Sequence, residues 1–186
     1  MGTSIKNKFL MSKIINKNLS LLTFLLVPLL FFSNPKFINL MGVQPHWSIF
    51  WLFSWGSIYG SFNGFLTGLA LGIVLDSLNY DFYTQIPGFI ICGILFGRLN
   101  GYKLASLNKF KYGLICSLGS LICNLLYFVQ IIFHNFENIN LVLVSNAIKT
   151  IFAQVFMTGI FAPIICTWLL AIFNKNNLQN RSRFLD

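Results

Sequence analysis

A long stretch of the chain, from Phe37 to Leu75, carries no Lys, Arg, Asp or Glu. Glycines recur within it at every fourth position and an acid continues the series, which consists of Gly60, Gly64, Gly68, Gly72 and Asp76. Residues four apart lie on one face of an α-helix, so the pattern predicts a helix with a strip of missing side chains. Such a strip allows a second helix to approach closely, as helices do in lipid. The pattern therefore predicts an integral membrane protein that packs through helix faces.

The apolar segments along the whole chain predict an all-α polytopic membrane protein with about six transmembrane helices. The predicted spans are Leu19–Ser33, Trp47–Tyr59, Asn63–Leu78, Thr84–Gly97, Tyr112–Phe133 and Ile151–Phe173. They make up one membrane domain, residues 19–173, between a basic leader (1–18) and a basic tail (174–186) that we expect to be mobile. A short amphipathic helix in the membrane interface is expected at Leu141–Thr150.

The segment from His46 to Leu78 could form one span or two. One helix of this length would extend about 50 Å, which exceeds the thickness of a bilayer core. A single span would also place the basic loop Asn100–Lys111 outside, whereas Lys and Arg prefer the cytoplasmic side. Two short spans joined by a turn at Gly60–Asn63 place this loop inside. We therefore prefer two spans, with both termini in the cytoplasm.

Composition and charge support a membrane protein. Hydrophobic residues make up 56% of the 186 residues and charged residues only 9%, against about 25% charged in average soluble domains. The net charge of +9 comes mainly from three clusters: Lys6, Lys8, Lys13 and Lys17; Arg98, Lys103, Lys109 and Lys111; Lys175, Arg181 and Arg183. These clusters flank apolar segments, as expected of topology determinants beside anionic lipid. The bilayer is thus the expected partner, and nucleic acid is not.

Few residues are available for chemistry. The acids are Asp76, Asp81, Glu137 and Asp186, and the four cysteines, all within predicted spans, are Cys92, Cys116, Cys123 and Cys166. His46 and His134 lie far apart in sequence, so no Cys/His spacing typical of a metal site is present. No GxSxG nucleophile motif occurs either. The sequence therefore favours a protein that is not an enzyme and needs no metal or cofactor.

Asp76 is the most informative polar residue, because an ionisable group near a membrane span is costly unless it has a partner or reaches water. It could bond an adjacent helix end or a partner protein, form a ligand or ion site, or simply be exposed; the first role is favoured. Gly93 and Gly97 form a second small-residue pair next to Arg98. Packing within the chain is the simplest interpretation of this pair. Further residues that could form hydrogen bonds between helices are Asn124, Gln130, Gln154 and Thr158.

Several segments carry a family resemblance: Gly42–Trp47, Gly64–Asp76, Thr84–Gly88, Gly97–Leu99 and Ala162–Pro163. Together they resemble the MreD family of rod-shape-determining integral membrane proteins of bacteria, in its cyanobacterial form. The resemblance covers roughly residues 40–173. Its most informative part is the series Gly-x-x-x-Gly-x-x-x-Gly-x-x-x-Asp that ends at Asp76.

The resemblance implies a scaffold of the cell-elongation machinery in the bacterial plasma membrane. Its partners would be MreC, MreB and the lateral-wall peptidoglycan synthases. Its fold would be similar to that of the substrate-binding subunits of energy-coupling-factor transporters. On this view the strip from Gly60 to Gly72 is expected to dock the transmembrane helix of MreC.

Two other functions stay open. A vitamin-binding subunit of an energy-coupling-factor transporter would share the fold, and it would need polar residues that converge on a cavity. Asp76, Asn124 and Gln154 are the candidates for such a site. A membrane enzyme is the third possibility, and it would have to use Asp76 or Asp81.

Overall fold

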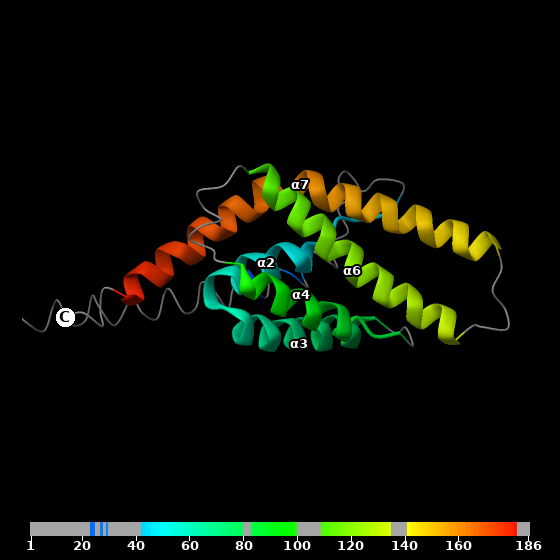
Figure 1. Ribbon diagram of the computed structural model, residues 1–186, viewed down its shortest axis with the longest axis horizontal. Coiled ribbons are helices and arrows are strands. Elements are labelled where there is room, and N and C mark those ends of the chain that lie inside the picture. The colour runs from blue at the N-terminus through cyan, green and yellow to red at the C-terminus, as the bar shows by residue number, and fades with distance from the viewer. Residues whose placement is uncertain are drawn as a thin grey trace, which may run out of the picture.

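The computed structural model describes residues 42–79, 83–99, 109–134 and 141–181, together with Thr23, Phe24, Val27 and Leu29. These residues form α-helices and connecting segments, with no β-strand among them. The helices are α2 (Trp47–Tyr59), α3 (Ser61–Leu78), α4 (Ile86–Arg98), α6 (Phe110–His134) and α7 (Leu141–Arg181). The predicted leader, most of the predicted first span and most of the basic loop 100–111 lie outside the described residues. Figure 1 shows α3 and α4 side by side, and α6 crossing α7.

The division of residues 46–78 into two helices is confirmed, because α2 ends at Tyr59 and α3 begins at Ser61. Gly60 alone separates them, and its φ of 91° lies in the left-handed region that favours glycine. The predicted four-residue turn is therefore too long, since Ser61 already belongs to α3. Gly60 makes the turn and does not continue the packing strip of α3.

Within the described residues, three helices are long and apolar enough to cross a membrane: Ser61–Leu78, Phe110–His134 and Val144–Asn174. The outer faces of α6 and α7 support this interpretation, because exposed apolar side chains follow each helix in a stripe. The stripes consist of Leu114, Leu118, Leu121, Leu125 and Val129 on α6, and of Phe152, Phe156, Ile160, Ile164 and Trp168 on α7. In water such faces would be polar, so lipid is the solvent they fit.

Helices α2 and α4 are shorter, at 13 residues each. A helix of this length extends about 20 Å, less than the roughly 30 Å of a typical hydrocarbon core. In α2 nine of the 13 residues are buried, and Ile49, Leu52 and Phe53 are fully enclosed. A helix that is apolar on all sides forms the centre of a core. Accordingly, α2 contacts α3, α4, α6 and α7.

Helix α7 corrects one expectation and is longer than the predicted span. Leu141–Thr150 is not a separate interfacial helix, because α7 runs without a break from Leu141 to Arg181. No Gly or Pro occurs between Leu141 and Thr158 that would end a helix. The first part of the predicted mobile tail, residues 174–181, is also helical. Pro163 lies inside α7, which changes direction about midway in Figure 1, as a proline in a helix interior causes.

Candidate functional site

The glycine strip of α3 lies against α4 of the same chain. A Cβ atom added to Gly64 would overlap the carbonyl group of Gly93, and a Cβ added to Gly93 would overlap that of Gly64. The two helices therefore meet backbone to backbone at this point. Only glycine permits so close an approach on both sides.

The same relation continues along the helix pair. A Cβ on Gly68 would overlap the Phe89 carbonyl, and one on Gly72 would lie 2.8 Å from Ile86 Cα. At the other end, a Cβ on Gly97 would overlap the backbone of Ser61. The strip is thus occupied along its length by α4, so in this structure it is not free to dock the transmembrane helix of another chain. Packing within the chain is also what the structure shows for Gly93 and Gly97.

Asp76 lies near the C-terminal end of α3 and beside the start of α4. Its Oδ1 accepts a hydrogen bond of 2.9 Å from the backbone N–H of Gln85, the N-cap residue of α4. A carboxylate at this position satisfies a free N–H and complements the partial positive charge of a helix N-terminus. The bond to an adjacent helix end is the role that the sequence favoured. Among the described residues, Oδ2 of Asp76 is buried without a hydrogen-bond partner.

A second polar contact fixes the start of α4 to α6. Gln130 accepts a hydrogen bond from the Thr84 N–H (3.0 Å) and donates one to the Thr84 carbonyl (2.8 Å). The side-chain amide thus pairs with both polar groups of one backbone residue. Arg98, at the opposite end of α4, is exposed in its last turn. A cation there is favourable because helix C-termini carry partial negative charge.

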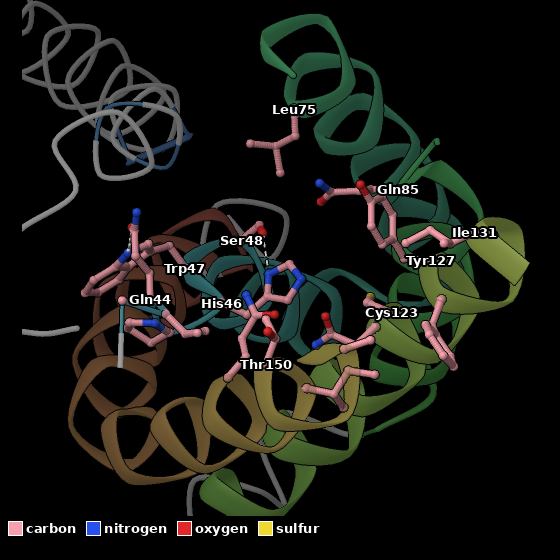
Figure 2. Close-up of a pocket in the computed structure, with 18 of the residues that line it drawn as sticks. Gln44, His46, Trp47, Ser48, Leu75, Gln85, Cys123, Tyr127, Ile131 and Thr150 are labelled. Carbon is pink, nitrogen blue, oxygen red and sulfur yellow. Dashed lines mark hydrogen bonds between the residues drawn. The ribbon is translucent and has the colours of Figure 1, made fainter. Parts of the chain in front are cut away.

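Beside this junction the structure contains a cavity of about 450 Å³. Its lining comes from the segment before α2, from the ends of α3 and α4, and from the facing sides of α6 and α7. Figure 2 shows His46, Leu75, Gln85 and Tyr127 around the open space. Asn124 and Gln154, two of the three residues considered for a ligand site, line this cavity. The third, Asp76, does not line it and holds the backbone of Gln85 instead.

His46 is fixed at the edge of the cavity by three contacts. Its backbone N–H donates to Thr158 Oγ1 (3.0 Å), and Nδ1 lies 3.0 Å from Ser48 Oγ. The ring also packs edge-on against Phe89, with centroids 5.4 Å apart. Burial lowers the pKa of His46 to about 4, so the ring is neutral near pH 7.

The amide side chains of the cavity are only partly used by the protein. Asn124 Nδ2 donates to the Ser120 carbonyl (2.8 Å), and Gln44 Oε1 accepts a bond from Trp47 Nε1 (3.3 Å). Within the described part of the chain, the side-chain amides of Gln85 and Gln154 form no hydrogen bond. Gln44, His46 and Gln85 lie in segments that carry the family resemblance, but they were not predicted as site residues. The polar run Gln44-Pro45-His46 in an otherwise apolar stretch was the available signal.

The cysteines form two close pairs inside the helix bundle. Cys92 Sγ lies 3.6 Å from Cys123 Sγ, and Cys116 Sγ lies 3.6 Å from Cys166 Sγ. All four are free thiols and buried, which agrees with their expected role as small apolar side chains. Among the described residues no group of three or more His, Cys, Asp and Glu could hold a metal ion.

Comparison with protein-family models, curated proteins and solved structures finds no match for this chain.

Proposed function

We propose that this protein is a non-enzymatic membrane scaffold of the bacterial cell-elongation complex. It would help to maintain rod shape by organising peptidoglycan synthesis with MreC, MreB and the lateral-wall synthases. The observation that supports this role is the resemblance of the Gly64–Asp76 series to the MreD family, now joined by a physical reason for the series. Its glycines bring α3 against α4, and its acid, Asp76, accepts a hydrogen bond from the backbone N–H of Gln85, the N-cap residue of α4.

We also propose the finer topology: six spans, both termini in the cytoplasm, and a fold similar to the substrate-binding subunits of energy-coupling-factor transporters. Most of the described basic residues support this orientation, with Lys149 as the exception. Arg98 ends α4 and Lys111 lies in the first turn of α6, so both belong to the same end of the bundle. Cysteine labelling from each side of the membrane would test it. Labels that reach a cysteine at Arg98 from outside would contradict the orientation.

Any partner has to approach faces other than the glycine strip, because α4 covers that strip. The outer face of α3 carries Leu66 and Ile73, which are 46% and 51% exposed. Photo-crosslinking amino acids placed at these positions, at Leu118 of α6 and at Phe156 of α7 would detect a neighbouring chain. The matched control is Leu71 of α3, which is fully buried.

The scaffold role predicts crosslinks to MreC in living cells from at least one exposed position and none from Leu71. Loss of rod shape on removal of the gene should accompany this result. Cells that keep their shape, with no crosslink from any exposed position, would contradict the proposal.

The cavity supports a second candidate function, that of a substrate-binding subunit of a vitamin transporter. Asn124 and Gln154 converge on it from α6 and α7, as such a subunit requires. Vitamin uptake by cells that express the protein with an energising transporter module would support this function. It would be rejected if uptake stayed at the level of cells without the protein.

A further inference from the structure

We propose that the cavity between α2, α4, α6 and α7 binds a small uncharged molecule that has a flat ring and an amide-like hydrogen-bonding edge. The inference deepens the second candidate function, since it names the class of ligand. The inference concerns binding alone and depends neither on transport nor on the scaffold role. It would hold for a protein that binds such a molecule without transporting it.

The cavity has the size and construction of a ligand site. Its volume of about 450 Å³ lies within the range of roughly 300–1,000 Å³ typical of sites for small molecules. Its lining combines many apolar side chains with a few polar ones, and no single loop supplies them. Residues from six separate segments meet there, so the site depends on the packed bundle.

Unused hydrogen-bonding groups point to what the ligand must offer. The Asn124 amide is bonded through Nδ2 only, and the amides of Gln85 and Gln154 have no partner among the described residues. An amide both donates and accepts hydrogen bonds, so its natural complement is another amide or a ring edge with adjacent donor and acceptor atoms. These three amides line the cavity and are half-buried, so a ligand in the cavity can supply the hydrogen-bond partners that the protein does not.

Charge and shape narrow the class further. The described lining contains no Lys, Arg, Asp or Glu. Its histidine, His46, is neutral near pH 7, so the lining offers no charged side chain to a ligand. A charged ligand would lose its hydration without gaining a counter-charge, which disfavours it strongly. Trp47, Tyr127 and Phe128 also line the cavity. Aromatic side chains stack well on flat rings.

The position of the cavity indicates the side from which a ligand enters. Its residues come from the start of α2 and α4, the end of α3, the second half of α6 and the first half of α7. Arg98 and Lys111 lie at the opposite ends of α4 and α6. Lys149 is the described base nearest the cavity, whereas most described bases lie at the other end, so in the proposed orientation the cavity lies toward the outer side of the membrane.

Binding can be measured with the full-length protein in lipid nanodiscs and four defined probes. Nicotinamide, thymine and riboflavin are flat and uncharged, whereas nicotinate is the carboxylate counterpart of nicotinamide. Equilibrium dialysis should show binding of at least one neutral probe, and nicotinate should bind at least about tenfold more weakly than nicotinamide if nicotinamide binds. Binding of none of the neutral probes would overturn the proposal, as would equal binding of nicotinate and nicotinamide.

Substitutions locate the binding in this cavity. Gln154→Met removes an amide that makes no bond in the protein, and Ala147→Phe fills part of the space. Both should weaken binding of the probe by at least about tenfold. Asn146→Leu is the control, because it removes an exposed amide of α7 that does not line the cavity. Unchanged binding by Ala147→Phe would overturn the assignment, provided that its thermal unfolding matches the unmodified protein.

If Ala147→Phe fails to fold, Gln154→Met decides the question. The test is also separate from both candidate functions. Binding without vitamin uptake would reject the transporter role and leave the binding site in place. Absence of MreC crosslinks would reject the scaffold role and have no bearing on the cavity.

Discussion

Gly64 of α3 and Gly93 of α4 meet through their backbones, and a methyl group on either residue would overlap the carbonyl of the other. This reciprocal relation explains why both helices carry glycine at the same level. Close backbone contact increases dispersion attraction between helices and permits weak Cα–H···O bonds. Because water is absent from a bilayer core, such contacts are a main source of helix association there.

We predict that Gly64→Ala lowers the free energy of unfolding, because the added methyl group overlaps the Gly93 backbone, which cannot rotate away. The expected loss is about 1–3 kcal/mol, the usual cost of overpacking. Thermal unfolding of the purified protein in nanodiscs would measure it.

The matched control is Gly159→Ala in α7. A Cβ at Gly159 would lie 3.5 Å from Ser117 Oγ, an ordinary contact. Alanine favours the helix over glycine, so this variant should be neutral or gain up to about 1 kcal/mol. Equal destabilisation by the two substitutions would contradict the prediction, because it would show that the loss does not come from overlap at the α3–α4 contact.

Asp76 should tolerate loss of its charge better than loss of its oxygen atoms. Asp76→Asn can keep the acceptor for the Gln85 N–H and gives up only the interaction of a charge with the start of α4, worth about 0.3–1 kcal/mol. Asp76→Leu leaves this N–H without its partner and should cost about 1–3 kcal/mol. Thermal unfolding would rank the two variants.

Gln85→Ala is the control for Asp76, because the hydrogen bond uses the backbone of Gln85 and not its side chain. It should keep most of the stability. If Asp76→Leu were as stable as the unmodified protein, the bond to the start of α4 would contribute nothing to the fold.

Gln130 should control local opening at the start of α4. Gln130→Met keeps the length of the side chain but removes both hydrogen bonds to Thr84. The amide of Thr84 should then exchange its hydrogen faster, because it loses the acceptor that Gln130 Oε1 provides. Hydrogen exchange followed by mass spectrometry would detect the change in the peptide that contains residues 83–85.

Gln154→Met makes the same chemical change on α7, where the side chain forms neither of the hydrogen bonds to Thr84. It should leave exchange in the peptide around Thr84 unaltered. Similar exchange in Gln130→Met and the unmodified protein would mean that the two hydrogen bonds do not hold this segment.

Local signals in the sequence were sufficient to predict most helices. α2 begins at Trp47 and ends at Tyr59 as predicted, because Gly60 can adopt the left-handed conformation that separates it from α3. The last span was predicted to end at Phe173, which agrees with the apolar segment Val144–Asn174, but the helix itself continues to Arg181 because helix-compatible residues follow. Loss of apolar character thus marked the end of the span and not the end of the helix.

The contacts between helices were harder to predict. The spacing of Gly64, Gly68 and Gly72 shows that some helix lies against α3, but this spacing is the same whether the neighbour is α4 or another chain. The cavity was even harder to predict from the sequence. His46, Gln85, Asn124 and Gln154 are far apart in sequence, and only the packing of four elements brings them together. The two residues named in advance, Asn124 and Gln154, stood out because amides are unusual within apolar spans.

Protonation of His46 should make stability depend on pH. Burial lowers its pKa in the folded protein to about 4, against 6.5 for the free side chain. Between these values the unfolded chain binds more protons, so stability is full above about pH 6.5 and falls as the pH drops toward 4. One pKa unit corresponds to about 1.4 kcal/mol, which limits the loss of stability to about 3 kcal/mol.

His46→Gln tests this prediction, because the variant has no titrating ring at this position. Its unfolding temperature should fall less over this pH range than that of the unmodified protein. Because carboxyl groups titrate in both proteins, the difference between the two curves isolates His46, and parallel curves would contradict a buried neutral ring.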